Sequence, residues 1–149
     1  MTQLQDFAGR SALVTGAASG IGVACARALA ARGAARLVLV DVDGAGLDAL
    51  DLPGEVHRIS GSVADEALWQ ALEPQMQGLD HAVVNAGIGA GGPIAKLTLA
   101  EWRRVMAVNL DGAFLTLAAS LRAMAAKGGS AVVVASTTGI KPVPGIGPY

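Results

Sequence analysis

Three glycines and a serine in the segment TGAASGIG, residues 15–22, have the types and spacing needed to bind an anion. Gly16 permits a tight turn after a strand, Gly20 lets a ligand approach the backbone, and Gly22 allows a helix to pack close to a sheet. Free N–H groups at the start of that helix, together with its dipole, favour a pyrophosphate. Ser19 adds a hydroxyl donor. The alternative is an ordinary strand-to-helix turn.

An aspartate follows this loop at the distance expected in a dinucleotide site. Asp41 ends the next apolar run, about 20 residues beyond the loop. A carboxylate there can accept two hydrogen bonds from a ribose diol, and it would repel a 2′-phosphate. Because Ala17, Ala18 and Val42 supply no cation for such a phosphate, the sequence favours NAD over NADP. The alternative is that Asp41 only forms a turn with the residues after it.

The elements that must position these groups alternate along the chain. Strands are predicted by short runs rich in Val, Leu and Ile, at residues 11–15, 36–40, 81–85 and 130–136, and by a weaker one at 55–59. The four apolar runs are continuous, which is typical of strands covered on both faces of a parallel sheet. Helical segments lie between them, at residues 20–32, 44–50, 64–76 and 100–126. This order predicts a doubly wound α/β fold in one dinucleotide-binding domain over residues 1–149.

The composition argues against several other classes of protein. A formal net charge of −1 gives no electrostatic case for binding nucleic acid or an anionic membrane. No apolar run reaches the roughly 18 residues of a membrane span, and the polar N-terminus does not resemble a signal peptide. His57 and His81 are not spaced as metal ligands with the single cysteine or with paired carboxylates, so no metal is predicted. We expect a cytoplasmic protein.

The predicted helix at residues 100–126 carries two apolar stripes. One consists of Trp102, Met106, Leu110, Ala113, Leu117, Leu121 and Met124, and the other of Val105, Val108, Gly112, Leu115 and Ala119. A helix on the outside of a sheet needs one apolar stripe. The second stripe needs a neighbouring helix or another subunit.

The glycine spacing resembles that of the short-chain dehydrogenase/reductase family, whose loop is Thr-Gly-x-x-x-Gly-x-Gly. Ile21 lies within the matching loop. Further matching motifs are NAG at Asn85, Ala86 and Gly87, VNL around Asn109, VVVAS ending at Ser136, and Tyr149 thirteen residues later. The resemblance runs from about residue 7 to the last residue. It implies a Rossmann-type sheet, and in the family the NAG motif lies beside the adenine ribose.

The resemblance also implies a reaction and a role for each active-site residue. The family transfers a hydride between a nicotinamide cofactor and a secondary alcohol or ketone. Tyr149 would be the acid/base, Ser136 would hydrogen-bond the substrate oxygen, and Asn109 would hold a water in a proton relay. A tyrosine has an ordinary pKa of about 10, and the family's lysine, four residues later, would lower that pKa. A dimer or tetramer through helix 100–126 is implied as well.

Two departures from the family pattern stand out. The family often has an Asp-Val pair near the adenine, and this chain has Ser62 and Val63, so a hydroxyl would make the adenine contact. The sequence given also ends at Tyr149, before the expected lysine. We therefore expect the sheet to be incomplete on its C-terminal side, the natural chain to continue, and residues 1–149 alone to lack turnover.

Structural alternatives remain for each active-site residue. Ser136 could cap a strand end, Asn109 could be a satisfied buried amide, and Tyr149 could be a loop aromatic. For the whole protein, a dinucleotide-binding module or sensor without turnover is the main rival to a dehydrogenase. A protein that uses the two-striped helix only as an interface is the weaker rival.

Overall fold

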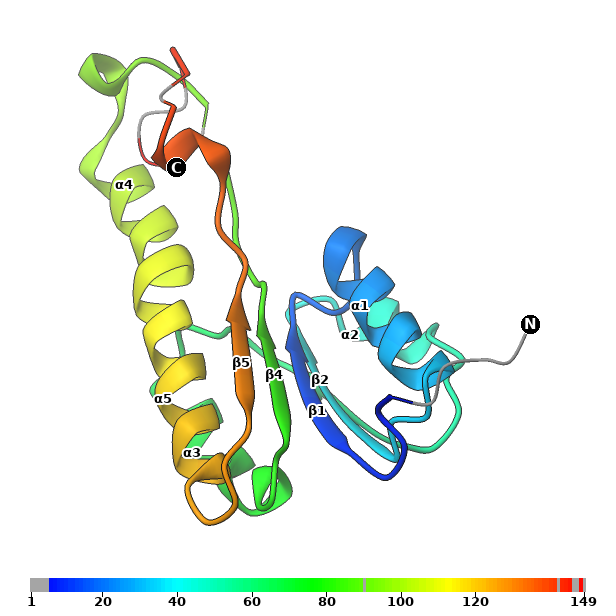
Figure 1. The fold of residues 1–149 in the computed structure, drawn as a ribbon. Coiled ribbons are helices and arrows are strands. Elements are labelled where there is room, and N and C mark those ends of the chain that lie inside the picture. The colour runs from blue at the N-terminus through cyan, green and yellow to red at the C-terminus, as the bar shows by residue number, and fades with distance from the viewer. Residues whose placement is uncertain (1–5, 90, 142, 146–147, 149) are drawn as a thin grey trace.

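A five-stranded parallel sheet forms the centre of the molecule (Figure 1). The computed structural model describes residues 6–89, 91–141, 143–145 and 148. The strands are β1 (Ser11–Thr15), β2 (Arg36–Asp41), β3 (Glu55–Ser60), β4 (His81–Val84) and β5 (Ser130–Val133). They lie in the order β3-β2-β1-β4-β5. The predicted parallel sheet is therefore confirmed. From β1 the chain adds β2 and β3 on one side, and it then crosses back to add β4 and β5 on the other side of β1.

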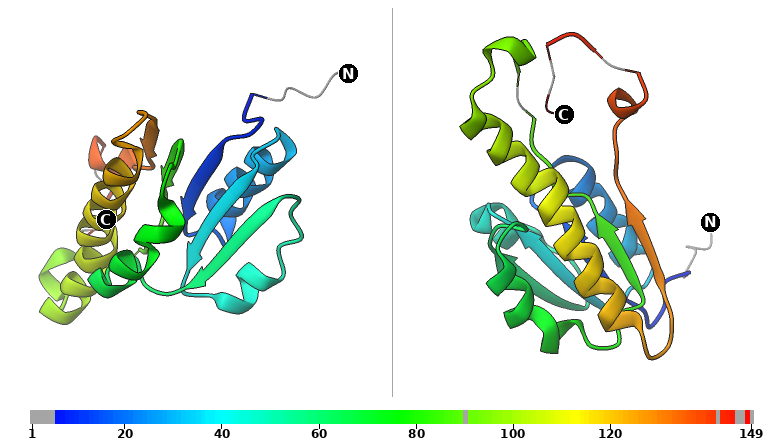
Figure 2. Two further views of the ribbon diagram at one scale, coloured as in Figure 1. Left: turned by 90° about the horizontal axis from the view of Figure 1, so that it is seen from below. Right: turned by 90° about the vertical axis from the view of Figure 1, so that its left-hand side faces the viewer.

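Helices cover the two faces of the sheet (Figure 2). One face carries α1 (Gly20–Ala31) and α2 (Gly44–Asp48). The other carries α3 (Glu66–Met76) and a long helix made of α4 (Leu99–Met106), the π-helical segment η2 (Ala107–Gly112) and α5 (Ala113–Met124). Two short 3-10 turns are η1 (Ile94–Lys96) and η3 (Thr137–Gly139). The doubly wound α/β class is confirmed.

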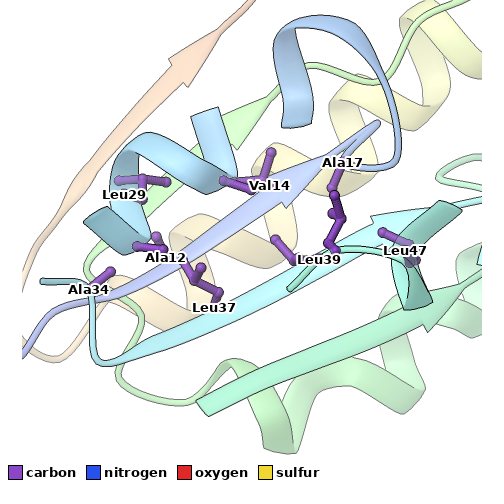
Figure 3. Close-up of a cluster of buried hydrophobic side chains, with 11 residues drawn as sticks. Ala12, Val14, Ala17, Leu29, Ala34, Leu37, Leu39 and Leu47 are labelled. Atoms are coloured by element: carbon purple, nitrogen blue, oxygen red, sulfur yellow. The ribbon is translucent and has the colours of Figure 1, made fainter. Parts of the chain in front are cut away.

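The apolar strands build two separate cores because successive side chains of a strand point to opposite faces. Ala12 and Val14 of β1 pack with residues of α1 and α2, as Figure 3 shows. Leu13, between them, belongs to the core on the α3 and α5 side, together with Trp69 and Leu72. The small side chains that dominate the first core let α1 lie close to the strands.

β5 forms an open edge, which confirms the expectation that the sheet is incomplete on its C-terminal side, but its apolar run is not covered on both faces. All four of its residues are exposed, with Val132 at 59% and Val133 at 50% of full exposure. The strand is hydrogen-bonded to β4 and, among the residues that the structure describes, to no strand on its other side. The outer edge and much of the surface of β5 are therefore open to solvent.

The long helix is only partly covered by the rest of the chain. Val105, Gly112 and Ala119 of the second predicted stripe are buried, whereas Trp102 and Leu121 of the first are exposed. Met124 is the exception in the first stripe, because it is buried beside α3. The helix thus keeps an exposed apolar side that includes part of the first stripe, and its cover by another subunit stays a prediction. Its exposed apolar members are Leu99, Trp102, Leu110, Phe114 and Leu121.

The same helix is long and apolar enough on average to span a membrane, although Asn109 and Asp111 interrupt its apolar residues and no continuous apolar run reaches that length. Leu99–Met124 has 26 residues and contains an 18-residue window of mean hydropathy 1.2, so by length and composition it could cross a bilayer. This is weak evidence, because a core helix of a soluble protein passes the same test. Here α5 packs against α3, β4 and β5.

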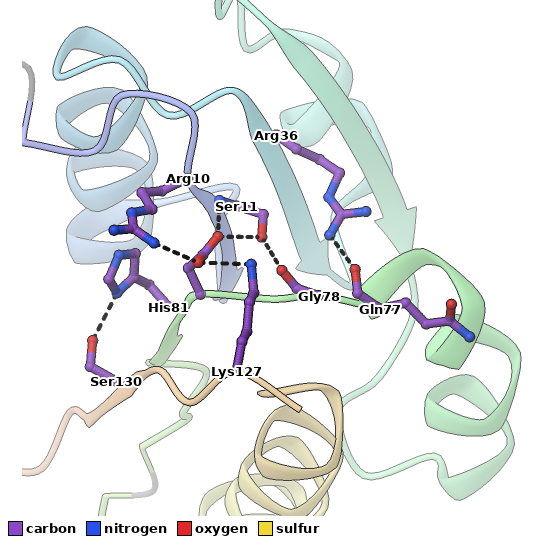
Figure 4. A network of polar contacts seen from close by, with 9 residues as sticks. Arg10, Ser11, Arg36, Gln77, Gly78, His81, Lys127 and Ser130 are labelled. Atoms are coloured by element: carbon purple, nitrogen blue, oxygen red, sulfur yellow. Dashed lines mark hydrogen bonds and ion pairs between the residues drawn. The ribbon is translucent and has the colours of Figure 1, made fainter. Parts of the chain in front are cut away.

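A buried carboxylate ties together the amino ends of β1 and β4 (Figure 4). Asp80 accepts hydrogen bonds from the backbone N–H of Ser11 at 2.9 Å and from its hydroxyl at 3.1 Å. It also forms ion pairs with Arg10 at 3.1 Å and with Lys127 at 2.9 Å. Burial alone would raise the pKa of Asp80, but its hydrogen bonds with Lys127, Ser11 and Arg10 hold the pKa well below the ordinary value of 3.8.

Candidate functional site

A cavity of about 690 Å³ opens at the carboxyl ends of the strands, the end opposite to Asp80. All the predicted site residues that the structure describes line it, apart from Gly22. They are Gly16, Ser19, Gly20, Ile21, Asp41, Ser62, Val63, Asn85, Ala86, Gly87, Asn109 and Ser136. Tyr149 lies outside the described residues. The fold therefore brings together segments that are far apart in the sequence, as expected at a crevice where a parallel sheet changes direction.

The glycine loop needs glycine at three positions, each for a different reason. Gly16 has a φ of 66°, and a Cβ added there would lie 2.9 Å from Nδ2 of Asn85. Gly20 has a φ of 50°, and among the described residues no atom lies within 4 Å of such a Cβ, which leaves the approach to the backbone open. At Gly22 a Cβ would lie 1.9 Å from the carbonyl oxygen of Gly16. Gly22 thus lets the loop fold back on the first turn of α1, and this contact differs from the predicted helix–sheet approach.

Asp41 lies at the end of β2, with its carboxylate between the glycine loop and the start of α2. Its Oδ2 accepts a hydrogen bond from the backbone N–H of Ala18 at 2.9 Å. Its Oδ1 accepts one from the N–H of Asp43 at 3.0 Å, which is the turn considered as an alternative role. Each carboxylate oxygen can accept a second hydrogen bond. The turn and the predicted contact to a ribose are therefore compatible.

The residues that replace the family's Asp-Val pair form one wall of the cavity. The hydroxyl of Ser62 accepts a hydrogen bond from the N–H of Ala64 at 3.2 Å. Val63 is buried, and its carbonyl accepts a hydrogen bond from Nε1 of Trp69 at 2.8 Å. A Cβ on Gly112 would lie 2.6 Å from Cγ2 of Val63, so glycine in the π-helical segment permits close contact with this wall.

The loop after β4 is fixed by a buried hydroxyl. Oγ1 of Thr15 accepts hydrogen bonds from the N–H groups of Asn85 and Ala86 at 3.0 and 3.1 Å. Nδ2 of Asn85 in turn donates to the carbonyl of Thr15 at 3.0 Å. The sequence analysis did not assign Thr15 a role. The available signal was a polar residue at the end of a fully apolar strand, immediately before Gly16.

Asn109 lies in the π-helical segment η2, and both polar atoms of its side chain are hydrogen-bonded to one residue. Oδ1 accepts a hydrogen bond from the N–H of Ile88 at 2.8 Å, and Nδ2 donates to the carbonyl of Ile88 at 2.9 Å. This is the satisfied amide considered as an alternative. π-helical turns are rare and are often found at functional sites. In this segment the long helix is hydrogen-bonded to the loop after β4.

Ser136 lies on the cavity wall, after the two residues Val134 and Ala135 that follow β5. Its Oγ accepts a hydrogen bond from the N–H of Thr138 at 3.2 Å and is 2.8 Å from Oγ1 of Thr138. The side chain therefore caps the short turn η3, as the structural alternative expected, while its oxygen stays within the cavity lining.

The charge in the cavity is concentrated at one point. Among the described lining residues, Asp41 is the only one with a charged side chain. No cluster of three or more His, Cys, Asp or Glu residues suited to a metal occurs in the described part of the chain. The open backbone at Gly20, the hydroxyl of Ser19 and the carboxylate of Asp41 fit the phosphate and ribose groups of a dinucleotide, and none of them would repel an uncharged adenine or nicotinamide amide.

Comparison with known families and proteins gives a consistent result. The family model of the short chain dehydrogenases matches residues 10–149. Cis-4-hydroxycyclohexanecarboxylate dehydrogenase of Sinomonas cyclohexanicum is 42% identical over an alignment of 141 positions, which covers 89% of this chain and 57% of that protein. D-threitol dehydrogenase of Mycolicibacterium smegmatis is 39% identical over an alignment of 150 positions, with the same two coverages. The chain thus spans little more than half the length of these curated relatives.

Solved structures with the same arrangement of elements were also found. A short-chain type dehydrogenase/reductase from Mycobacterium marinum superposes with a TM-score of 0.89 at 30% identity, over 99% of this chain and 63% of that one. Levodione reductase superposes with a TM-score of 0.85 at 36% identity, over 96% of this chain and 60% of that one.

Proposed function

Because the chain belongs to the short-chain dehydrogenase family, we propose that it provides the cofactor-binding part of an enzyme that transfers a hydride between NAD(H) and a secondary alcohol or ketone. Members of this family are oxidoreductases and generally use NAD or NADP. The observation that carries the proposal is the single cavity that contains the glycine loop, Asp41, Asn109 and Ser136.

The described residues suit a bound NAD in three places. The glycine loop, with the hydroxyl of Ser19, takes the pyrophosphate at the start of α1. Asp41 takes the adenosine ribose, and its negative charge disfavours the 2′-phosphate of NADP because the described lining offers no compensating cation. Ser62 and Val63 flank the adenine, and the loop of Asn85, Ala86 and Gly87 lies beside its ribose.

The proposed chemistry divides the work between the cofactor and the chain. Bound NAD supplies the hydride acceptor at its nicotinamide ring. Tyr149, as the phenolate, removes the proton of the alcohol hydroxyl, so that loss of hydride from the carbon leaves a ketone and a neutral tyrosine. Ser136 holds the substrate oxygen by a hydrogen bond. Asn109 supports the water of the proton relay through its backbone, since its side chain is engaged by Ile88.

The substrate class follows from the lining away from Asp41. Ile88, Val134 and Ala135 make this part of the described wall apolar, with Ser136 as a polar exception. Such a wall suits an uncharged carbon skeleton with few hydroxyls. One relative is named for cis-4-hydroxycyclohexanecarboxylate and another for D-threitol, and we propose a cyclic secondary alcohol or ketone as the first substrate class to test, with threitol as the contrast.

Assembly and location complete the proposal. The exposed apolar side of the long helix, which includes Trp102, Leu110, Phe114 and Leu121, would be covered by a second copy in a homodimer or homotetramer. We also propose that the protein is cytoplasmic. We further propose that residues beyond Tyr149 supply the lysine that lowers its pKa.

The proposal is tested by initial rates of the full-length enzyme with NAD and with NADP, using cyclohexanol and threitol as contrasting alcohols. We expect turnover with NAD to exceed turnover with NADP by roughly tenfold or more, the factor that one unfavourable charge contact is worth. The Asp41→Ala variant should lose that preference. Equal or better use of NADP by the unmodified enzyme would contradict the cofactor assignment, and tight NAD binding without turnover of any alcohol would favour the sensor instead.

A further inference from the structure

The carboxylate of Asp41 connects two segments that otherwise lie apart in the sequence. Oδ2 binds the N–H of Ala18, in the middle of the glycine loop, and Oδ1 binds the N–H of Asp43, before α2. The two segments also touch, since a Cβ added to Gly46 would lie 3.0 Å from Cβ of Ala18. The glycine loop therefore lies against α2. Among the described contacts, Asp41 is the only side chain that accepts a hydrogen bond from a backbone N–H of the loop.

Ala18 has no other partner in the described structure for its backbone N–H. It lies between the turn at Gly16 and the start of α1 at Gly20, where N–H groups are not used by the helix. Ser19, which precedes the helix, makes no side-chain cap to replace that acceptor. Removing the carboxylate of Asp41 would leave the middle of the loop with only the longer backbone hydrogen bond from Ala17 to the carbonyl of Val40, at 3.3 Å.

From this geometry we infer that Asp41 is a positioning residue for the glycine loop, in addition to its proposed contact with the ribose. It holds the loop through Ala18 in the shape that presents the N–H groups around Gly20 to a phosphate. The loop shape is a property of the free protein, whereas the consequence for ligands rests on the proposed function. Asp41 would thus act on the pyrophosphate end of the site without touching it.

For the affinity of an Asp41 variant toward a diphosphate, this inference predicts a change opposite to the one that electrostatics alone predicts. If Asp41 only binds a ribose diol, its replacement by alanine should leave the affinity for a diphosphate without that diol unchanged. The affinity could even increase, because a negative charge is removed near a negative ligand. If Asp41 holds the loop, the same replacement should weaken binding of that ligand.

The first arm of the test uses 2′,3′-dideoxyadenosine 5′-diphosphate, which has the two phosphates but no ribose diol. Its affinity is measured by calorimetry for the full chain and for the Asp41→Ala, Asp41→Ser and Asp43→Ser variants. Ser at position 41 can keep the short turn to Asp43 but is too short to reach Ala18. We expect both Asp41 variants to bind roughly tenfold more weakly, which is the loss of one hydrogen bond to a charged group.

Asp43→Ser is the matched control. It removes one negative charge from the same neighbourhood and leaves a good helix cap for α2, where Asp43 now accepts from the N–H of Gly46 at 2.9 Å. The Asp43 side chain does not touch the glycine loop in the described contacts. This variant should bind the dideoxy ligand as tightly as the unmodified protein or slightly more tightly.

The second arm needs no ligand. Hydrogen exchange of the Ala18 amide is followed by NMR, with circular dichroism to verify folding. We expect exchange to be roughly tenfold faster in both Asp41 variants and unchanged in Asp43→Ser. Unchanged Ala18 exchange in Asp41→Ala, or unweakened binding of the dideoxy ligand by that variant, would overturn the inference. If the unmodified protein bound neither ADP nor the dideoxy ligand, the proposed function would fail, and Ala18 exchange alone would decide the inference.

Discussion

Asn85 donates two hydrogen bonds to Thr15, one from its backbone and one from its side chain. Oγ1 of Thr15 accepts from the N–H of Asn85 at 3.0 Å, and Nδ2 of Asn85 donates to the carbonyl of Thr15 at 3.0 Å. The first residue lies at the end of β1 and the second directly after β4. The glycine loop and the loop of the NAG motif are therefore fixed to each other before any cofactor binds.

Replacing Thr15 by valine should destabilise the protein by about 2–3 kcal/mol. The valine has a similar shape, but it removes the acceptor of two N–H groups that lie beside a buried side chain, and leaving such groups unpaired is costly. The free energy of unfolding is measured by urea titration. Thr15→Ser keeps the hydroxyl and serves as the control, so equal stability of the valine and serine variants would show that the hydroxyl has no such role.

Gly22→Ala should weaken NAD binding even though alanine is a better helix former by about 1 kcal/mol. The added Cβ would lie 1.9 Å from the carbonyl oxygen of Gly16, so the loop must move away from its anion-binding shape. We expect a loss of affinity of roughly tenfold or more, corresponding to ~1.4 kcal/mol or above. Gly89→Ala, where a Cβ meets no described atom within 4 Å, is the control, and equal NAD affinities of the two variants would contradict the prediction.

The sequence predicted the strands closely because each apolar run is short and ends in small or polar residues. The segment 11–15 coincides with β1, and the predicted helix 44–50 contains α2. Asp41 and Asn85 were placed correctly at one edge, since the carboxyl ends of parallel strands lie together. These are the features that depend on local pattern alone.

Other features depend on contacts between distant segments, and the sequence did not reveal them. The pairing of Asn109 with Ile88 requires the long helix to widen into a π-helical turn, and its letters, AVNLDG, resemble those of any helix. The open edge at β5 was expected, but the exposure of all four of its residues depends on what lies beside the strand rather than on its own composition. The Asp80 cluster joins Asp80 to Arg10, which lies 70 positions earlier, and to Lys127, which follows the long helix.

Asp80→Asn should lower the free energy of unfolding by about 2 kcal/mol at neutral pH, as expected for lost hydrogen bonds to a charged group. Since the pKa of Asp80 is lowered in the folded protein, its contribution is fully present above the ordinary value of 3.8 and is lost as the pH falls below it. The difference between the unmodified protein and the variant should therefore shrink in acid. Urea titrations across that range are the measurement, with exposed Asp51→Asn as the control, and a difference that grows in acid would reverse the assignment.

Charge on the exposed side of the long helix should break the proposed assembly. Phe114 and Leu121 are 67% and 55% exposed, and burying glutamate at both positions in an interface would be strongly unfavourable. Light scattering of the full-length enzyme at micromolar concentration should give a mass of two or four chains, and the double glutamate variant should give one. Gln70→Glu on α3 is the charge control. A single-chain mass for the unmodified enzyme would exclude the assembly.

The π-helical segment η2 has the same effect as one extra residue in the long helix. An α-helix turns by about 100° with each residue, and the wider turn between Ala107 and Gly112 takes up the extra residue without passing that rotation on to α5. Removal of one residue here would close the turn and leave the buried Met124 and the exposed Leu121 facing as they do now. The effect of such a deletion would therefore be local: it would act on the hydrogen bonds between Asn109 and Ile88, and through them on the loop after β4, rather than on the packing of α5.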